Sequence, residues 1–173
     1  MNQELFEEEK QAAKRGWIKL ALVIFFIVSV AFIRDNVMNF SIVFGTSMEE
    51  TLHEGDVLLV NTGKENIERY DIITMRVGEV RLIKRVIGLP GEAVQIIDGK
   101  IHIDGKEIVE QHAGFTDYGG VAEEVYCLDE DEYFVMGDNR AESVDSRSFG
   151  SINAEDVIGE VVFVIHPFNK EFR

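Results

Sequence analysis

The chain contains 173 residues, of which 46% are hydrophobic and only two are proline, so we expect one ordinary folded domain rather than a disordered chain. Its 17 lysines and arginines face 32 aspartates and glutamates. The resulting formal net charge of −15 repels phosphate backbones and argues against nucleic-acid binding. The single cysteine, Cys127, allows no internal disulfide, so the fold must depend on its apolar core.

The first predicted element is a transmembrane helix over residues 17–34. The run from Leu20 to Ile33 carries no charge, and adding Trp17, Ile18 and a snorkelling Lys19 extends the apolar segment. Residues 17–33 would form about 25 Å of helix, which is short but sufficient to span a bilayer.

Two other interpretations of this apolar run are a buried core helix and a cleaved signal peptide. The sequence Ser29-Val30-Ala31 has the small-x-small form of a cleavage site. Cleavage there would cut inside the apolar run, and the preceding region is long and contains an acidic stretch at residues 7–9. These features favour an uncleaved membrane anchor.

The basic residues around the anchor predict its orientation. Lys10, Lys14, Arg15 and Lys19 lie on the N-terminal side, whereas only Arg34 flanks the other end. By the positive-inside rule, we expect residues 1–16 in the cytoplasm, residues 17–34 in the cell membrane and residues 35–173 as an extracytoplasmic domain.

Beyond the anchor, short β-branched runs predict a mostly β domain. They include VLLV, DIITMRV, VRLIKRVIG, AVQII, YFVMG and IGEVVFVIH. The Asp-Gly pairs at residues 98–99 and 104–105 predict tight hairpin turns, whereas residues 109–124 show neither helical nor strand periodicity and are predicted as a loop.

The stretch GTSMEETL contains Ser47, which could be a nucleophile or a turn residue. A serine becomes nucleophilic only when a neighbouring base takes its proton. The four histidines have no acid at a diagnostic spacing and form no H-x-x-x-H pair, so the sequence favours neither a Ser-His-Asp triad nor a metal site. They are His53, His102, His112 and His166.

Lys84 is a second candidate base. In VRLIKRVIG, strand alternation places it on one face with Leu82 and Val86, so its side chain could be half buried. Its pKa would have to fall by roughly 3 units, or about 4 kcal/mol, for it to act near neutrality. From this pattern alone, an exposed lysine on an edge strand is the better interpretation.

Three motifs carry a family resemblance when they occur in this order behind an anchor. GTSMEETLHEGD, RLIKRVIGLPGE and GDNRAESVDSRSFG resemble the boxes of bacterial type I signal peptidases, the Ser-Lys endopeptidases that cut signal peptides from exported proteins. The single anchor and short middle region resemble the compact Gram-positive enzymes. The resemblance implies a mostly antiparallel β catalytic domain of signal-peptidase type.

The resemblance also assigns roles to individual residues. It makes Ser47 the nucleophile, Lys84 the general base and Ser143 the hydroxyl that orients the amine, with Asp145 paired to Arg147 and Arg85 behind the site. The oxyanion would be held by the Ser47 N–H and by a second donor from Thr46, backbone or water, because Gly45 replaces a serine of some relatives. The implied substrate-pocket residues are Val43, Phe44, Met48, Leu52, Leu82 and Ile83, which could equally be ordinary core.

Glu50 departs from the family pattern, which has proline at this position. Proline would fix φ and pre-shape the turn after the nucleophile. If Glu50 only loosens this turn, Glu50→Pro is expected to stabilise the protein by roughly 0.4–1 kcal/mol. The alternative is that Glu50 contacts a basic residue of a particular substrate.

The sequence therefore predicts a membrane-bound serine endopeptidase that cleaves signal peptides from preproteins after small residues, through an acyl-enzyme at Ser47. The expected partners are preproteins and the lipid bilayer, with the secretion translocon or pilins as further candidates, and no metal or organic cofactor is implied. One alternative is a non-catalytic binding or assembly protein, for example in pilus biogenesis. Another is a self-cleaving Ser-Lys repressor, against which the anchor and the lack of a DNA-binding region argue.

Overall fold

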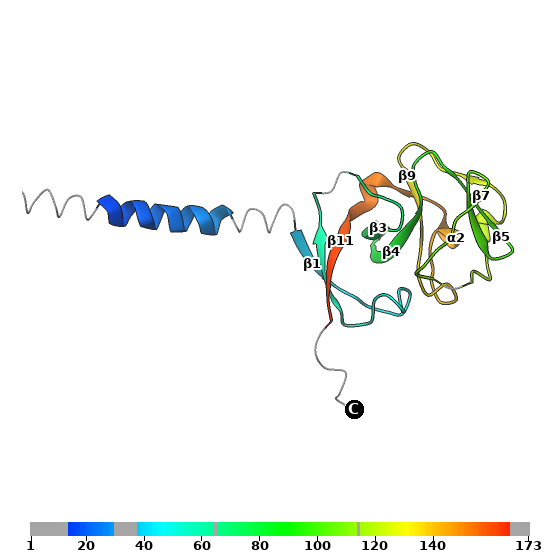
Figure 1. Ribbon diagram of the computed structural model, residues 1–173, viewed down its shortest axis with the longest axis horizontal. Coiled ribbons are helices and arrows are strands. Elements are labelled where there is room, and N and C mark those ends of the chain that lie inside the picture. The colour runs from blue at the N-terminus through cyan, green and yellow to red at the C-terminus, as the bar shows by residue number, and fades with distance from the viewer. Residues whose placement is uncertain (1–13, 30–37, 64–65, 114, 167–173) are drawn as a thin grey trace, which may run out of the picture. The chain divides into compact units, whose positions relative to one another are not determined.

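The structure of the chain is a computed structural model that describes residues 14–29, 38–63, 66–113 and 115–166. It separates into two units, Met1–Met38 and Asn39–Arg173. In the first unit, residues 14–29 form a helix, drawn in blue in Figure 1. Its apolar side chains are exposed, Trp17 by 71% and Phe25 by 70%.

The predicted anchor falls only partly on this helix. Positions 30–34 of the predicted span lie outside the described residues. Over the described part of the chain, no helix combines the length and the apolar character needed to cross a membrane.

The second unit contains a seven-stranded sheet. The strand pairs β2–β11, β11–β3, β3–β4, β4–β9 and β9–β10 are antiparallel, which confirms the predicted mostly antiparallel β class. The strand order is β1-β2-β11-β3-β4-β9-β10, so the last strand of the described chain lies between β2 and β3 (Figure 1). The strands are β1 Met38–Ile42, β2 Val57–Asn61, β3 Ile72–Val77, β4 Val80–Gly88, β9 Glu132–Met136, β10 Ile152–Asn153 and β11 Val157–Ile165.

A smaller sheet has the order β7-β6-β5-β8. Its strands are β5 Ala93–Ile97, β6 Lys100–Ile103, β7 Lys106–Glu107 and β8 Tyr126–Cys127. Asp98 and Gly99 both have positive φ, as do Asp104 and Gly105. This backbone is that of a two-residue hairpin turn, and the observed β5–β6 and β6–β7 pairs confirm the Asp-Gly prediction.

The remaining regular elements are short. The segment predicted as a loop, residues 109–124, contains the 3-10 helix η1 (Gly120–Glu123), whose Ala122 is fully buried. The helix α2 (Ser146–Phe149) begins at Asp145, whose side chain accepts a hydrogen bond from the Arg147 N–H. The 3-10 helix η2 (Ala154–Asp156) leads into β11.

One of the buried apolar clusters supports the segment that contains Ser47. It consists of Val43, Met48, Leu52, Leu58 and Val60. Because residues on both sides of Ser47 are held in this cluster, the serine is positioned by the core rather than by a free surface loop.

Candidate active site

Ser47 lies in a single tight turn that follows β1. The Leu52 N–H donates to the Met48 carbonyl at 2.8 Å, and the Glu49 N–H donates to the Thr46 carbonyl at 3.0 Å. Met48 and Leu52 are buried, whereas Ser47 is only partly buried. The turn therefore fixes the backbone while it leaves the Ser47 hydroxyl accessible.

Lys84 points its amine at this hydroxyl. The Lys84 Nζ donates to the Ser47 Oγ at 2.6 Å. Lys84 lies in the middle of β4, where it is the ladder partner of Ile73 in β3, and it is only 2% exposed. The exposed-lysine interpretation of the sequence is therefore wrong, because β4 turns this side chain into the protein.

Burial lowers the pKa of Lys84 from its ordinary value of 10.5 to about 8. The carboxylates of Asp145 and Asp138 act in the opposite direction and raise this pKa, whereas the charge of Arg147 lowers it. A substantial fraction of the amine is therefore neutral slightly above neutral pH. A neutral amine 2.6 Å from a serine hydroxyl can accept the hydroxyl proton.

Asp145 and Arg147 form a buried ion pair behind this site, as the sequence predicts. The Arg147 Nε and Nη2 donate to the two Asp145 carboxylate oxygens at 2.8 and 2.9 Å. Burial by itself raises the pKa of Asp145, but hydrogen bonds from Arg147 and from the Gly137 N–H bring that pKa below its ordinary value. Asp145 is therefore a fixed negative charge near the lysine.

The predicted pairing of Asp145 with Arg85 is wrong. Arg85 instead donates from Nε and Nη2 to the two oxygens of Asp138 at 2.8 and 2.6 Å. Side chains alternate along a strand, so Arg85 leaves β4 on the opposite face from Lys84 and meets a different carboxylate. This second ion pair ties β4 to the segment that follows β9.

Ser143 lies close to the site but does not bond to the lysine. Its Oγ is buried and makes no hydrogen bond of normal geometry within the described structure. The hydroxyl still lies near enough to Asp145 to help lower the pKa of that carboxyl. The role of Ser143 in orienting the amine thus remains a prediction.

Two residues of the GDNR segment hold the Ser47 turn, and the sequence interpretation missed both. The Asn139 N–H donates to the Ser47 carbonyl, and its side-chain amide donates to the Thr46 carbonyl, each at 3.1 Å. A Cβ on Gly137 would lie 2.4 Å from the Ser47 carbonyl oxygen and 2.2 Å from the Ser143 Oγ. The motif itself was visible, but nothing in its residue types showed that it contacts the turn.

The two predicted oxyanion donors have different surroundings. The Ser47 N–H donates to no other group in the described part of the chain and remains free for a ligand. The Thr46 hydroxyl donates to the Glu142 carboxylate at 3.1 Å, so it is already engaged.

Glu50 has a φ of +88°, which overturns the expected benefit of proline at this position. Proline requires φ near −65°, so it cannot replace Glu50 without rebuilding the turn. This conformation could not be predicted from the residue type, because glutamate rarely adopts positive φ.

An apolar cavity of about 650 Å³ opens next to the serine–lysine pair. Of the six predicted pocket residues, five line it: Val43, Phe44, Met48, Leu82 and Ile83. Leu52 does not, because its side chain is fully buried in the cluster beneath the turn. Residues 39–42 of β1 line the cavity as well.

These features define an antiparallel β protein with a serine–lysine pair at an apolar cavity. The family described as signal peptidase, peptidase S26, matches residues 14–166, and the chain belongs to this family. It is 33% identical to a signal peptidase I of Bacillus amyloliquefaciens over 98% of this chain and 97% of the relative. It is 35% identical to a signal peptidase I of Bacillus licheniformis over 94% of this chain and 96% of the relative.

A solved structure of a signal peptidase I from Enterococcus faecalis V583 is 29% identical in sequence, with a TM-score of 0.47. The match covers 57% of this chain and 98% of that chain.

Proposed function

We propose that this chain is a membrane-bound signal peptidase I that cleaves N-terminal signal peptides from exported preproteins, with Ser47 as nucleophile and Lys84 as general base. The observation that carries these roles is the 2.6 Å contact between the Lys84 Nζ and the Ser47 Oγ, with the amine buried. The signal peptidase family membership supplies the reaction.

The reaction proceeds through an ester at Ser47. The neutral Lys84 amine takes the hydroxyl proton while Oγ bonds to the scissile carbonyl carbon, and the free Ser47 N–H stabilises the resulting oxyanion. When the peptide C–N bond breaks, the Lys84 ammonium returns its proton to the leaving amine. The neutral lysine then activates a water that hydrolyses the ester and restores Ser47.

In this proposal, Ser143 orients the Lys84 amine toward Ser47. Among the residues that the structure describes, its buried hydroxyl has no hydrogen-bond partner of good geometry, and it lies beside Gly137 where the Ser47 turn also approaches. Buried hydroxyls are normally satisfied. A small rotation toward the amine would satisfy this one and hold the lysine lone pair toward Ser47.

The cavity would accept the small side chains that precede the cleavage site. β9 pairs with β4 from Arg85 to Gly88, so among the described strands the backbone of residues 80–84 has no partner on that side. An extended substrate could add along this edge by main-chain hydrogen bonds, with its small side chains in the apolar cavity.

The exposed apolar helix supports the proposed anchor over residues 17–34. Large apolar side chains such as Phe25 and Phe26, 70% and 68% exposed, are costly in water and stable in lipid. The N-terminus would be cytoplasmic and the β domain extracytoplasmic, where signal peptides emerge. The translocon and pilins are possible partners under this proposal.

The test is cleavage of a purified preprotein by the full chain in detergent, followed by mass spectrometry of the mature product. Ser47→Ala and Lys84→Ala are each expected to abolish cleavage, because the pair acts as a unit. Ser148→Ala and Lys100→Ala, which change exposed residues, are the matched controls. Binding of preprotein without cleavage by the unmodified chain would instead support the non-catalytic assembly role.

A further inference from the structure

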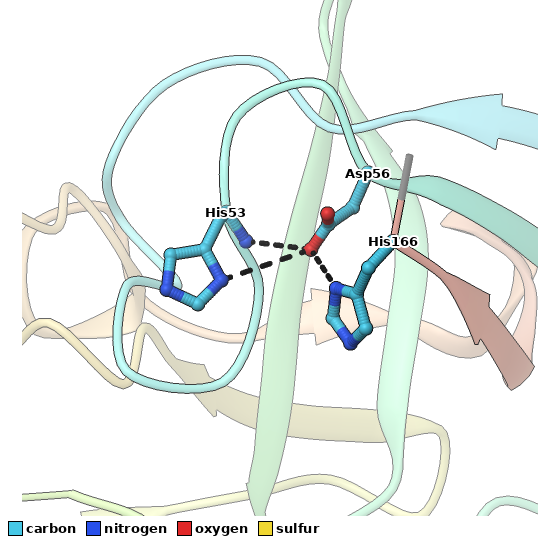
Figure 2. Close-up of side chains that lie close together, drawn as sticks. All are labelled: His53, Asp56 and His166. Carbon is cyan, nitrogen blue, oxygen red and sulfur yellow. Dashed lines mark hydrogen bonds and ion pairs between the residues drawn. The ribbon is translucent and has the colours of Figure 1, made fainter. Parts of the chain in front are cut away.

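The structure brings together two histidines and an aspartate outside the cavity. His53, Asp56 and His166 each offer a possible metal-ligating atom, and these three atoms lie within 4.8 Å of one another. None of the three residues lines the cavity beside Ser47. Figure 2 shows the Asp56 carboxylate between the two imidazole rings.

The backbone explains how residues so far apart in sequence meet. Val57 and Ile165 are paired in the antiparallel ladder between β2 and β11. Asp56 precedes Val57 and His166 follows Ile165, so the ladder places these two residues side by side. His53 joins them through the turn that ends at Asp56, whose N–H donates to the His53 carbonyl at 3.1 Å.

The carboxylate is held in a fixed orientation. Asp56 is 3% exposed, its Oδ2 accepts a hydrogen bond from the His53 N–H at 2.8 Å, and its carbonyl accepts one from the Val43 N–H at 2.9 Å. Within the described chain, its ion-pair partners are the two histidines and no lysine or arginine. A buried carboxylate that is oriented by a backbone N–H and faces two imidazoles is well placed to ligate a metal ion.

The distances suit a small cation of intermediate softness. The Asp56 Oδ2 lies 3.0 Å from the His166 Nδ1 and 3.9 Å from the His53 Nδ1. Zn–N and Zn–O bonds of about 2.0–2.2 Å in tetrahedral geometry place ligand atoms about 3.4 Å apart, between these two values. Both imidazoles are substantially exposed, 43% and 62% by side chain, so small rotations can equalise the distances.

We infer that His53, Asp56 and His166 form a zinc-binding site that fastens the end of β11 to the turn preceding β2. Two imidazoles and one carboxylate match the nitrogen and oxygen ligands that Zn²⁺ accepts, and they leave a fourth position for water. Mg²⁺ and Ca²⁺ prefer sets of oxygen ligands and are not expected to bind here. This site is structural, and the reaction at Ser47 does not pass through it.

The test uses the full chain in detergent, purified without a polyhistidine tag and stripped of metal with a chelator. Zinc is titrated against a chromophoric competitor. We expect one zinc per chain, and affinity at least ~10-fold lower in His166→Ala and in His53→Ala. The control is His112→Ala, which changes an exposed histidine elsewhere and should leave zinc affinity unchanged.

A second readout is thermal unfolding. Zinc should raise the Tm of the wild type and of His112→Ala, because a ligand that binds only the folded state stabilises it. It should not raise the Tm of His166→Ala, and Mg²⁺ should raise none of them. Equal zinc affinity in His166→Ala and wild type, or the absence of stoichiometric binding by the wild type, would overturn the site.

Discussion

Replacing the buried Lys84 by methionine should make the protein inactive and more stable. Methionine has a similar length and no charge, so it removes the ammonium without opening a large void. The fall in the pKa of Lys84 from 10.5 to about 8, caused mainly by burial, corresponds to about 3 kcal/mol at 1.36 kcal/mol per pKa unit. This is the approximate cost of keeping the amine charged inside the fold.

The pH dependence of this gain follows from the same pKa values. At pH 7 the lysine is protonated in both the folded and the unfolded chain, so the wild type bears the full cost. Between about pH 8 and 10.5 the folded chain has lost a proton that the unfolded chain retains, and the stability of the wild type rises with pH. The advantage of Lys84→Met should therefore shrink across this range.

The assay is urea unfolding of the full chain in detergent at pH 7 and pH 9.5, with the free energy of unfolding compared between wild type and Lys84→Met. Lys100→Met is the matched control, because the Lys100 side chain is 58% exposed and should show no such pH-dependent difference. A Lys84→Met protein less stable than the wild type at pH 7, or a difference that does not change with pH, would refute the reasoning.

Three further outcomes can be measured on the same preparation. The rate of preprotein cleavage should rise with pH through about 8, because only the neutral Lys84 amine can accept the Ser47 proton; a rate that falls over pH 7–9 contradicts the base assignment. Because Glu50 has a φ of +88°, Glu50→Gly should stabilise the protein by ~1 kcal/mol and Glu50→Pro should destabilise it by more than that. Urea unfolding that shows the reverse order of stability would rule out this turn geometry. Asn139→Ala should lower kcat by ~10-fold or more with little change in KM, because it releases the Thr46 carbonyl and loosens the turn; an unchanged kcat would show that the turn holds without it.

The sequence predicted features that depend on local chemistry. The Asp-Gly turns appear where their residue types favour positive φ, and the side chains of the β4 neighbours Lys84 and Arg85 meet different partners, as strand alternation requires. The Asp145–Arg147 pair was expected only from the family resemblance, and the structure contains it at the start of α2.

Features that depend on long-range pairing were not predictable from one sequence. Asp56 and His166 are brought together by the β2–β11 ladder across more than a hundred residues, so a search for short histidine spacings cannot find them. Arg85 was assigned to the wrong carboxylate for the same reason, because the position of Asp138 depends on how β9 pairs with β4. The positive φ of Glu50 was not predicted, because glutamate rarely adopts this conformation.

The position of β11 in the large sheet determines when, during synthesis of the chain, Ser47 and Lys84 can be brought together. β2, which follows the Ser47 turn, and β3, which leads into the Lys84 strand, do not pair with each other, and each pairs with β11. The ribosome makes β11 after every other described strand, so a nascent chain carries the proposed nucleophile and base long before the sheet can join them. Non-local pairing of this kind forms slowly. A chain arrested before Val157 should therefore show no cleavage activity.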